Sequence, residues 1–175
     1  MQGGRMTTGT QEQSTFEPRP MAALALAGWL LLCLAVSGVS SIFPVHSLPT
    51  WYAGLIKPSL TPLNAVFGPT WTVLFVLMGI SAWMVWKTRP SVCRVRGLRL
   101  FLIQLAFAFL WNWTFFGRHQ MLTALADIVI LLVTITMTIW TFRKMSVTAA
   151  WLLVPYLAWV GFVTYLNLGF WRLNP

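Results

Sequence analysis

Tryptophan is the residue type whose number and spacing in this sequence point most directly to chemistry. The chain has 11 tryptophans among its 175 residues. Trp71, Phe75 and Met78 follow one another at i, i+4 and i+7, so they share one face of a helix. Indole and phenyl rings stack on flat apolar molecules, and the stripe therefore predicts an aromatic pocket for a flat hydrophobic ligand. The alternative is that the aromatic stripes only pack helices together or form belts at the membrane interfaces.

Polar residues inside the apolar runs are few, and Asp127 is the only acid among them. We expect it to pair with Arg118 or His119 across the preceding turn, or to face an aqueous rim. As an intramembrane carboxylate it also raises the alternative of a small proton-coupled transporter. Gln104 and Asn112 are most simply explained as hydrogen-bonding links between helices.

Catalytic patterns are missing from the sequence. It has no Ser–His–Asp set, no phosphate-binding loop, no pair of carboxylates and no spacing typical of a metal site. We therefore favour a protein that is not an enzyme, binds no metal and requires no cofactor.

The composition identifies the environment of these residues. Hydrophobic residues make up 58% of the chain and charged residues 9%, whereas a soluble domain has about 25% charged residues. The mean hydropathy is +0.73. Too few polar side chains are present to cover a surface in water, so the sequence predicts an all-α integral membrane protein.

Five apolar runs, each long enough to cross the bilayer as a helix, predict a bundle of five transmembrane helices. The predicted spans are 21–43, 66–86, 100–117, 121–142 and 147–170. Residues 1–20 are polar and predict a disordered tail, which leaves 21–175 as one membrane domain.

The formal net charge of +9 follows the membrane topology and not a nucleic-acid site, because the basic residues lie between the apolar runs. Nine of them share one side and three the other. The nine are Arg5, Arg19, Lys87, Arg89, Arg94, Arg96, Arg99, Arg143 and Lys144. By the positive-inside rule the N-terminus is cytoplasmic and the C-terminus outside. The basic loops and the lack of a targeting peptide favour a bacterial inner membrane.

The loop over residues 44–65 carries four prolines and several apolar residues, among them Trp51 and Tyr52. A loop this apolar is expected to fold back over the bundle as a lid; the alternative is an ordinary interfacial loop. The predicted topology brings Trp71, Trp111 and Trp159 towards each other beneath it.

Several motifs along the sequence resemble those of a known family. The run from Trp51 to Pro58, followed by Pro62, Phe67, Pro69 and Trp71, is similar to the tryptophan-rich sensory proteins. These form the bacterial TspO branch of the translocator proteins, also called peripheral benzodiazepine receptors. The third and fifth helices resemble the family as well, through Gln104-Leu105, Trp111 and Phe115-Phe116-Gly117, and through Pro155-Tyr156-Leu157-Ala158-Trp159 and Tyr165-Leu166-Asn167. The resemblance covers roughly residues 21–174.

The resemblance implies a homodimer that binds porphyrins, haem and sterol-like hydrophobes in a pocket capped by the first loop. By position, Tyr52 and Pro62 belong to the lid, and the pocket is lined by Trp71, Phe75, Phe115, Trp159 and Val163. Ala108 stands where the family commonly has an asparagine that bonds a ligand, and Asn112 is one helical turn away. The ten candidate ligand-binding residues are the lid and pocket residues just named together with Asn112, Trp51 and Trp111.

We therefore expect a membrane receptor or translocator that affects tetrapyrrole traffic. The resemblance also implies light-dependent porphyrin breakdown, for which Trp71 and Trp159 would be the oxidisable aromatics. The alternative is a signalling or scaffold protein that acts through partners, with the loop 87–99, five of whose thirteen residues are basic, as the contact.

Overall fold

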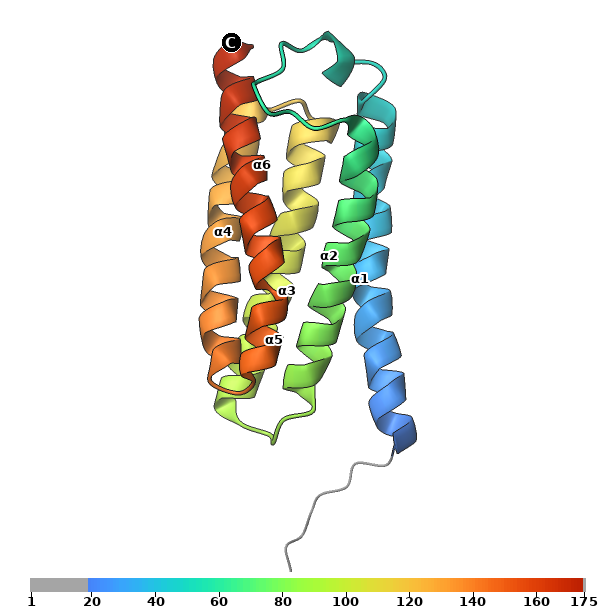
Figure 1. Cartoon of the computed structure of the whole chain (residues 1–175), viewed down its shortest axis with the longest axis vertical. Helices are drawn as coiled ribbons and strands as arrows, with labels where there is room; N and C mark the ends of the chain where they lie inside the picture. Colours follow the sequence, from blue (N-terminus) through green and yellow to red (C-terminus); the bar gives the residue numbers. More distant parts are fainter. Residues whose placement is uncertain (1–18, 175) are drawn as a thin grey trace, which may run out of the picture.

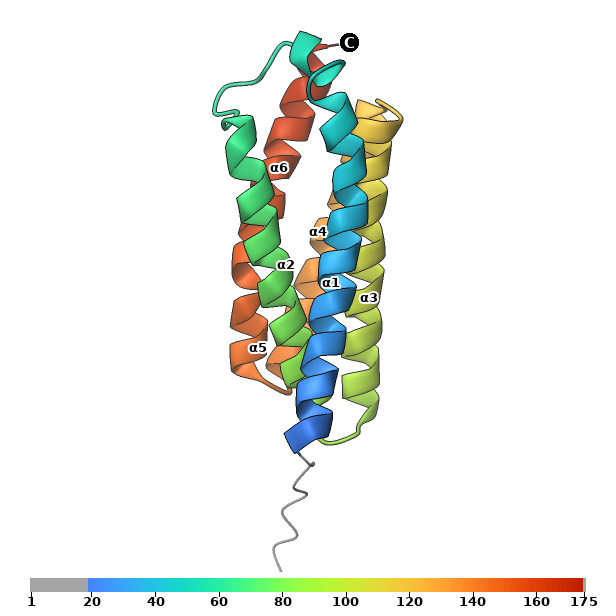
Figure 2. The same cartoon turned by 90° about the vertical axis from the view of Figure 1, so that its right-hand side faces the viewer.

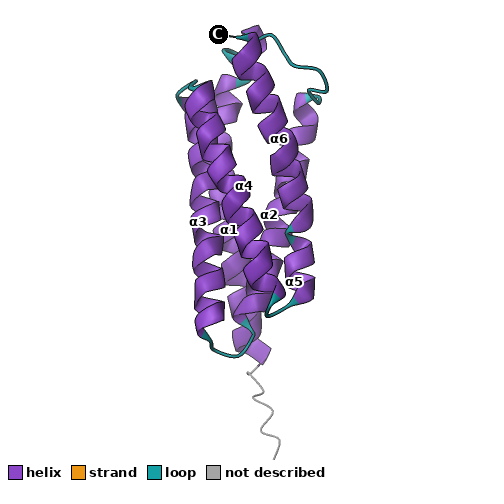
Figure 3. Cartoon of the chain, turned by 90° about the vertical axis from the view of Figure 1, so that its left-hand side faces the viewer, coloured by secondary structure: helices purple, strands orange, loops and turns teal. Residues whose placement is uncertain are grey.

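The computed structural model describes residues 19–174, and within them the chain forms helices joined by short loops, with no strand (Figure 3). Five stretches of this described part are long and apolar enough to cross a membrane. They are Met21–Ser47, Asn64–Trp86, Val92–Gly117, Met121–Arg143 and Val147–Leu173. The predicted five-helix membrane bundle is confirmed, and the chain is an integral, multi-pass membrane protein. The predicted tail lies outside the described residues as far as residue 18.

The elements follow the order of the predicted spans (Figure 1). They are α1 (Arg19–Ser47), η1 (Tyr52–Gly54), α2 (Asn64–Trp86), α3 (Val92–Asn112), η2 (Trp113–Gly117), α4 (Met121–Arg143), α5 (Val147–Leu152) and α6 (Val154–Leu173). Pro155 accounts for the interruption between α5 and α6. It has no N–H to donate to the carbonyl of Trp151, so the fifth span consists of two helical segments.

Helix α3 begins at Val92, eight residues before the predicted start of the third span. The side chain of Ser91 accepts a hydrogen bond from the Arg94 amide and caps the helix. The apolar run marks only the part of α3 that lies in the hydrocarbon. The helix also includes the basic turns before that run. Smaller extensions occur at the start of α1, α2 and at the end of α1, α4 and α6.

The two ends of the bundle, at the bottom and top of Figure 1, differ in the number of basic residues that they carry. At one end, called here the basic end, lie the start of α1 and the loops 87–91 and 144–146. Two lysines there cover tryptophan rings, with Lys87 Nζ 3.4 Å from the Trp83 ring centroid and Lys144 Nζ 4.0 Å from that of Trp140. Asp127, the only acid in the described part of the chain, lies near the start of α4 at the opposite end of the bundle, so no described carboxylate at the basic end balances these cations. Which end is cytoplasmic stays a prediction.

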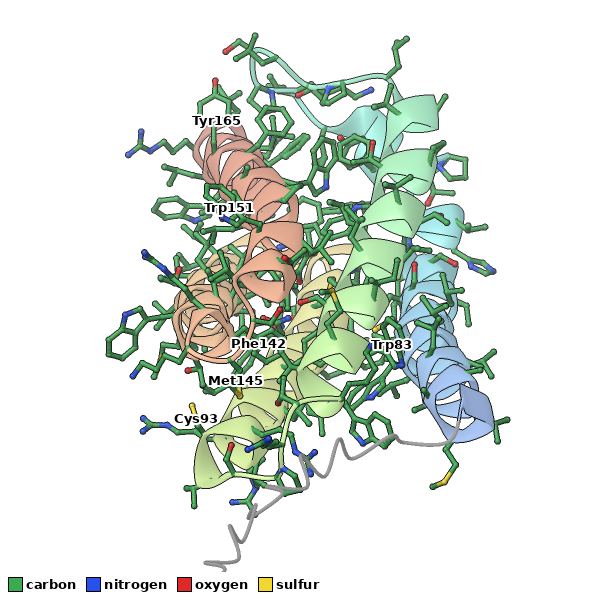
Figure 4. All side chains as sticks on the ribbon, turned by 60° about the horizontal axis from the view of Figure 1, so that its bottom comes forward. Trp83, Cys93, Phe142, Met145, Trp151 and Tyr165 are labelled. Carbon is green, nitrogen blue, oxygen red and sulfur yellow. The ribbon has the colours of Figure 1, made fainter. Side chains whose placement is uncertain are left out.

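Helices α1 and α2 lie side by side (Figure 2) and touch closely towards the basic end. A Cβ added to Gly79 would lie 3.2 Å from Leu30 Cα and 3.3 Å from the Trp29 carbonyl oxygen. Further along, Trp83 Nε1 donates to the Ala22 carbonyl at 2.8 Å (Figure 4). A Cβ at position 79 would force α1 and α2 apart by a few tenths of an ångström, so Gly79 allows the two helices their close contact.

The other end of the bundle, called here the lid end, is covered by the lid, residues 48–63, as predicted (Figure 1). Pro58 of the lid is buried and packs on α6 at Gly169. A Cβ added to Gly169 would lie 2.6 Å from Pro58 Cβ. The lid therefore rests directly on the α6 backbone.

Replacing Gly169 with alanine is expected to push the lid away from α6. Overpacking of this kind destabilises proteins by about 1–3 kcal/mol, so the variant should unfold at a lower temperature in detergent. Gly161→Ala is the matched control, because it lies on the same helix and its Cβ meets no atom within 4 Å. A Gly169→Ala variant as stable as Gly161→Ala would contradict the close contact.

Candidate functional site: an aromatic cavity beneath the lid

A cavity of about 460 Å³ lies beneath the lid, between α1, α2 and the junction of α3 with η2. Its lining is mainly aromatic and aliphatic, with scattered hydroxyl and amide groups. The lining residues are Leu34, Ser37, Gly38, Ser40, Ser41, Pro44, Val45, Leu48, Tyr52, Asn64, Phe67, Gly68, Trp71, Thr72, Phe75, Trp111, Asn112 and Phe116.

Trp71 is the centre of the aromatic cluster beside this cavity. Its ring centroid lies 6.1 Å from that of Phe75, 6.4 Å from that of Trp111 and 6.3 Å from those of both Tyr156 and Trp159. These are offset or edge-on contacts, which aromatic rings prefer. Trp71 and Phe75 of the predicted helical stripe thus border the cavity, and Trp71 also packs against aromatic rings of α3 and α6.

Five of the ten candidate ligand-binding residues line the cavity. They are Tyr52, Trp71, Phe75, Trp111 and Asn112. The indole of Trp111 donates from Nε1 to Asn167 Oδ1 at 3.0 Å, and Asn167 Nδ2 donates to the Met121 carbonyl at 2.9 Å. This chain of hydrogen bonds fixes the Trp111 ring and ties α3, α4 and α6 together.

Two further candidates, Trp51 and Phe115, lie outside the cavity lining and support its roof. Trp51 stacks on His119, with 4.2 Å between ring centroids and 15° between planes. The Trp51 and Phe115 rings meet edge-on with 5.7 Å between their centroids, and Phe115 stacks on Trp111, also with 5.7 Å between centroids. Their role as ligand contacts stays a prediction.

The remaining candidates, Pro62, Trp159 and Val163, also lie outside the lining. Trp159 packs edge-on against Trp71 at 87° and against the cavity residue Phe67, but is not itself among the lining residues. Val163 is buried on α6, and Pro62 is half-buried in the lid. Direct contact of these three residues with a ligand likewise stays a prediction.

Helix α1 forms a whole wall of the cavity, which the sequence analysis did not predict. Seven of its residues line the space, from Leu34 to Val45. The available signal was a run of small residues, Ser37, Gly38, Ser40 and Ser41, within an otherwise aliphatic helix. Small residues at helical spacing leave room beside a helix, but the sequence does not say what fills that room.

Two polar groups in the cavity can bond a ligand. Ser40 Oγ is buried and has no hydrogen-bond partner among the described residues. Asn112 Nδ2 donates to the Ala108 carbonyl at 3.1 Å, and its amide carries a second N–H and a carbonyl oxygen beyond this bond. Because an unpaired buried polar group is costly, Ser40 favours a ligand that offers an acceptor or a donor.

The lid contributes a neutral aromatic and a nearby cation. Tyr52 is almost fully buried against Phe116 and Phe170, with ring centroids at 5.9 Å and 5.2 Å. Burial raises the pKa of the Tyr52 hydroxyl above its usual value, so this group stays protonated at neutral pH. Lys57 Nζ lies 5.5 Å from the Tyr52 ring centroid and places a positive charge over this ring.

Asp127 lies outside the cavity lining, in a contact between α4 and η2. Its Oδ2 is 2.7 Å from Thr114 Oγ1, and Thr114 Oγ1 also lies 2.8 Å from the Leu110 carbonyl oxygen. The expected pairing with Arg118 or His119 is not formed, since no salt bridge of Asp127 occurs among residues 19–174. His119 instead bonds through Nε2 to Ser47 Oγ at 3.3 Å.

Polar bonds from α6 hold the lid in place. Asn174 Oδ1 accepts from the Ile56 amide at 2.9 Å, and Asn174 Nδ2 donates to the Ile56 carbonyl at 3.0 Å. Tyr165 rises from α6 towards the lid (Figure 4), where its hydroxyl is 2.9 Å from that of Ser59. Together with the Trp51–His119 stack, these bonds close the cavity at the lid end.

Comparison with known proteins agrees with this architecture. Residues 29–172 match the model of the TspO/MBR family. The Tryptophan-rich protein TspO of Chlorobaculum tepidum is 41% identical over 153 residues, which is 87% of this chain and 97% of that protein. The protein of the same name from Archaeoglobus fulgidus is 39% identical over 155 residues, covering 88% and 99%. The Translocator protein of Homo sapiens is 41% identical over 126 residues, covering 71% and 75%.

Asn174→Ala is expected to loosen the lid without unfolding the bundle, because it removes both hydrogen bonds to Ile56. Hydrogen–deuterium exchange of the Ile56 amide should accelerate, by about tenfold if the bonds contribute roughly 1.4 kcal/mol in total. Arg172→Ala is the control, since Arg172 is exposed on the same helix end. Equal exchange in the two variants would mean that Asn174 does not hold the lid.

Proposed function

Since the chain belongs to the TspO/MBR family, we propose that it is a membrane receptor or translocator for flat hydrophobic ligands, with tetrapyrroles as the first candidates. The cavity beneath the lid carries this proposal. Its volume of about 460 Å³ falls within the range of about 300–1,000 Å³ that small-molecule sites occupy.

The arrangement of rings suits a planar ligand. Trp71 and Trp111 both line the cavity, with their planes only 35° apart, so the two indoles form a broad wall. A macrocycle lying against this wall would gain offset stacking, and its polar edge could bond Ser40 or Asn112. Lys57, which lies over the ring of the lining residue Tyr52, would favour a ligand with carboxylate groups.

Assembly and placement complete the proposal. We expect a homodimer in a bacterial inner membrane, with the basic end in the cytoplasm, as the resemblance and the charge distribution predict. A protein that signals through partners would use the same basic end as its contact. Proton coupling through Asp127 has less support, because that side chain is bonded to Thr114 and lies outside the cavity lining.

Quenching of tryptophan fluorescence by protoporphyrin in detergent tests the proposed site. Trp71→Leu should weaken saturable quenching by about two- to tenfold in Kd, because one aromatic pair contributes about 0.5–1.5 kcal/mol. Trp140→Leu is the matched control: it also removes one tryptophan, but from an exposed position near the basic end. If quenching of the wild type does not saturate, no specific tetrapyrrole site exists and the proposal fails.

A second candidate activity, light-dependent porphyrin breakdown, is favoured by the contact between Trp71 and Trp159. Their ring centroids lie 6.3 Å apart, so one oxidisable indole borders the cavity and a second one is in contact with it. Trp71→Phe combined with Trp159→Phe keeps aromatic packing but removes both indoles. We expect the double variant to bind protoporphyrin yet lose breakdown under illumination, measured by loss of its absorbance. Trp140→Phe combined with Trp151→Phe should break it down normally, and breakdown by both double variants would remove this activity from the site.

A further inference from the structure

The cavity is bordered on its lipid-facing side by two rows of exposed residues. On α1 the row is Gly38, Ser41 and Val45, and on α2 it is Asn64, Gly68 and Thr72. Residues at these spacings follow one edge of a helix. The two edges belong to neighbouring helices (Figure 2) and lie within the membrane-spanning stretches Met21–Ser47 and Asn64–Trp86.

The space between these rows is open, in contrast to the contact nearer the basic end. A Cβ added to Gly38 or Gly68 meets no atom within 4 Å, whereas one added to Gly79 would lie 3.0 Å from Leu30 Cδ2. Helices α1 and α2 therefore close on each other towards the basic end and leave a lateral mouth towards the lid end.

The mouth offers little resistance to an apolar molecule. Its two rows carry no charged residue. The hydroxyl of Ser41 donates to the Gly38 carbonyl at 2.7 Å, and that of Thr72 donates to the Gly68 carbonyl at 3.0 Å. Each hydroxyl is thus satisfied by its own helix, and a passing ligand breaks no hydrogen bond between elements.

The lid end offers the opposite conditions. Entry there requires separating Asn174 from Ile56 and Tyr165 from Ser59, and moving Trp51 off His119. Each such hydrogen bond contributes about 0.5–1.5 kcal/mol, and the stacked pair adds to that cost.

We propose that ligands enter and leave the cavity sideways, from the hydrocarbon of the leaflet nearer the lid, through the mouth between α1 and α2. This inference rests on the proposed function, because it concerns the route to the same cavity. The ligand class is a flat hydrophobe already dissolved in the bilayer, and the lid serves as a fixed roof. Gly38 and Gly68 keep the passage wide.

Stopped-flow quenching with protoporphyrin in phosphatidylcholine proteoliposomes tests this route. Gly38→Leu combined with Gly68→Leu fills the mouth without a clash, since both positions face open space. A narrowed passage raises the barrier in both directions, so association and dissociation should each slow by about fivefold or more, whereas a weakened binding site would speed dissociation. Dissociation is followed by transfer of the porphyrin to protein-free vesicles.

Two further variants make the result specific. Gly28→Leu is the matched control, because Gly28 is an exposed glycine of α1 with open space around it, outside the cavity lining. Asn174→Ala loosens the lid and should leave both rates unchanged if the lid is not the entrance. The single variants Gly38→Leu and Gly68→Leu replace the pair if the double variant does not fold, and each should show a smaller slowing.

The outcomes separate this inference from the proposed function. Slower exchange in the mouth variants, with Gly28→Leu and Asn174→Ala at wild-type rates, supports the lateral route. Saturable binding with unchanged rates in the mouth variants, or faster association in Asn174→Ala, overturns the route while the site stands. Absence of saturable binding by the wild-type protein overturns the proposed function itself.

Discussion

The close contact of α1 with α2 at Gly79 is the constraint on which the rest of the site depends. Without a side chain at this position the α1 backbone can approach α2, with Leu30 Cα 3.2 Å from where a Cβ would lie. The helices are joined again at Trp83 and Ala22. Because both contacts lie towards the basic end, α1 is held as an outer wall while its other half stands away from α2. The cavity is the space that this one-sided contact leaves.

The opposite wall is rigid for a different reason. Trp111 is fixed by Asn167, which also bonds the Met121 carbonyl, so one amide connects three helices. In hydrocarbon an unsatisfied N–H is costly, and the indole of Trp111 therefore has a strongly preferred orientation. Trp71 packs against this fixed ring. The cavity thus lies between the outer helix α1 and an aromatic wall held in place by Asn167.

Hydropathy was sufficient to predict the number of spans and the class of fold, because a run without charges has few alternatives in a protein of this composition. It placed the start of α3 eight residues late, since the arginines of its first turns lie in a helix but not in an apolar run. The stripe of Trp71 and Phe75 was predictable from helical spacing. The α1 wall was not, because the approach at Gly79 decides which small residues of α1 face the gap. Trp159 was placed beside Trp71 correctly, yet only the packing shows that it contacts this ring without lining the cavity.

A lateral mouth changes what the cavity must do to hold a ligand. A molecule that arrives from water gains free energy by leaving it, at about 25 cal/mol for each Å² of apolar surface buried. A molecule that arrives from lipid tails has already gained this free energy when it entered the bilayer. Helix association in membranes likewise gains no hydrophobic free energy. Selectivity must then come from ring stacking against Trp71 and Trp111 and from the few polar atoms in the cavity. The unpartnered hydroxyl of Ser40 gains particular weight in this setting, because lipid tails cannot satisfy it, and a ligand that bonds it is favoured over one that is merely flat and apolar.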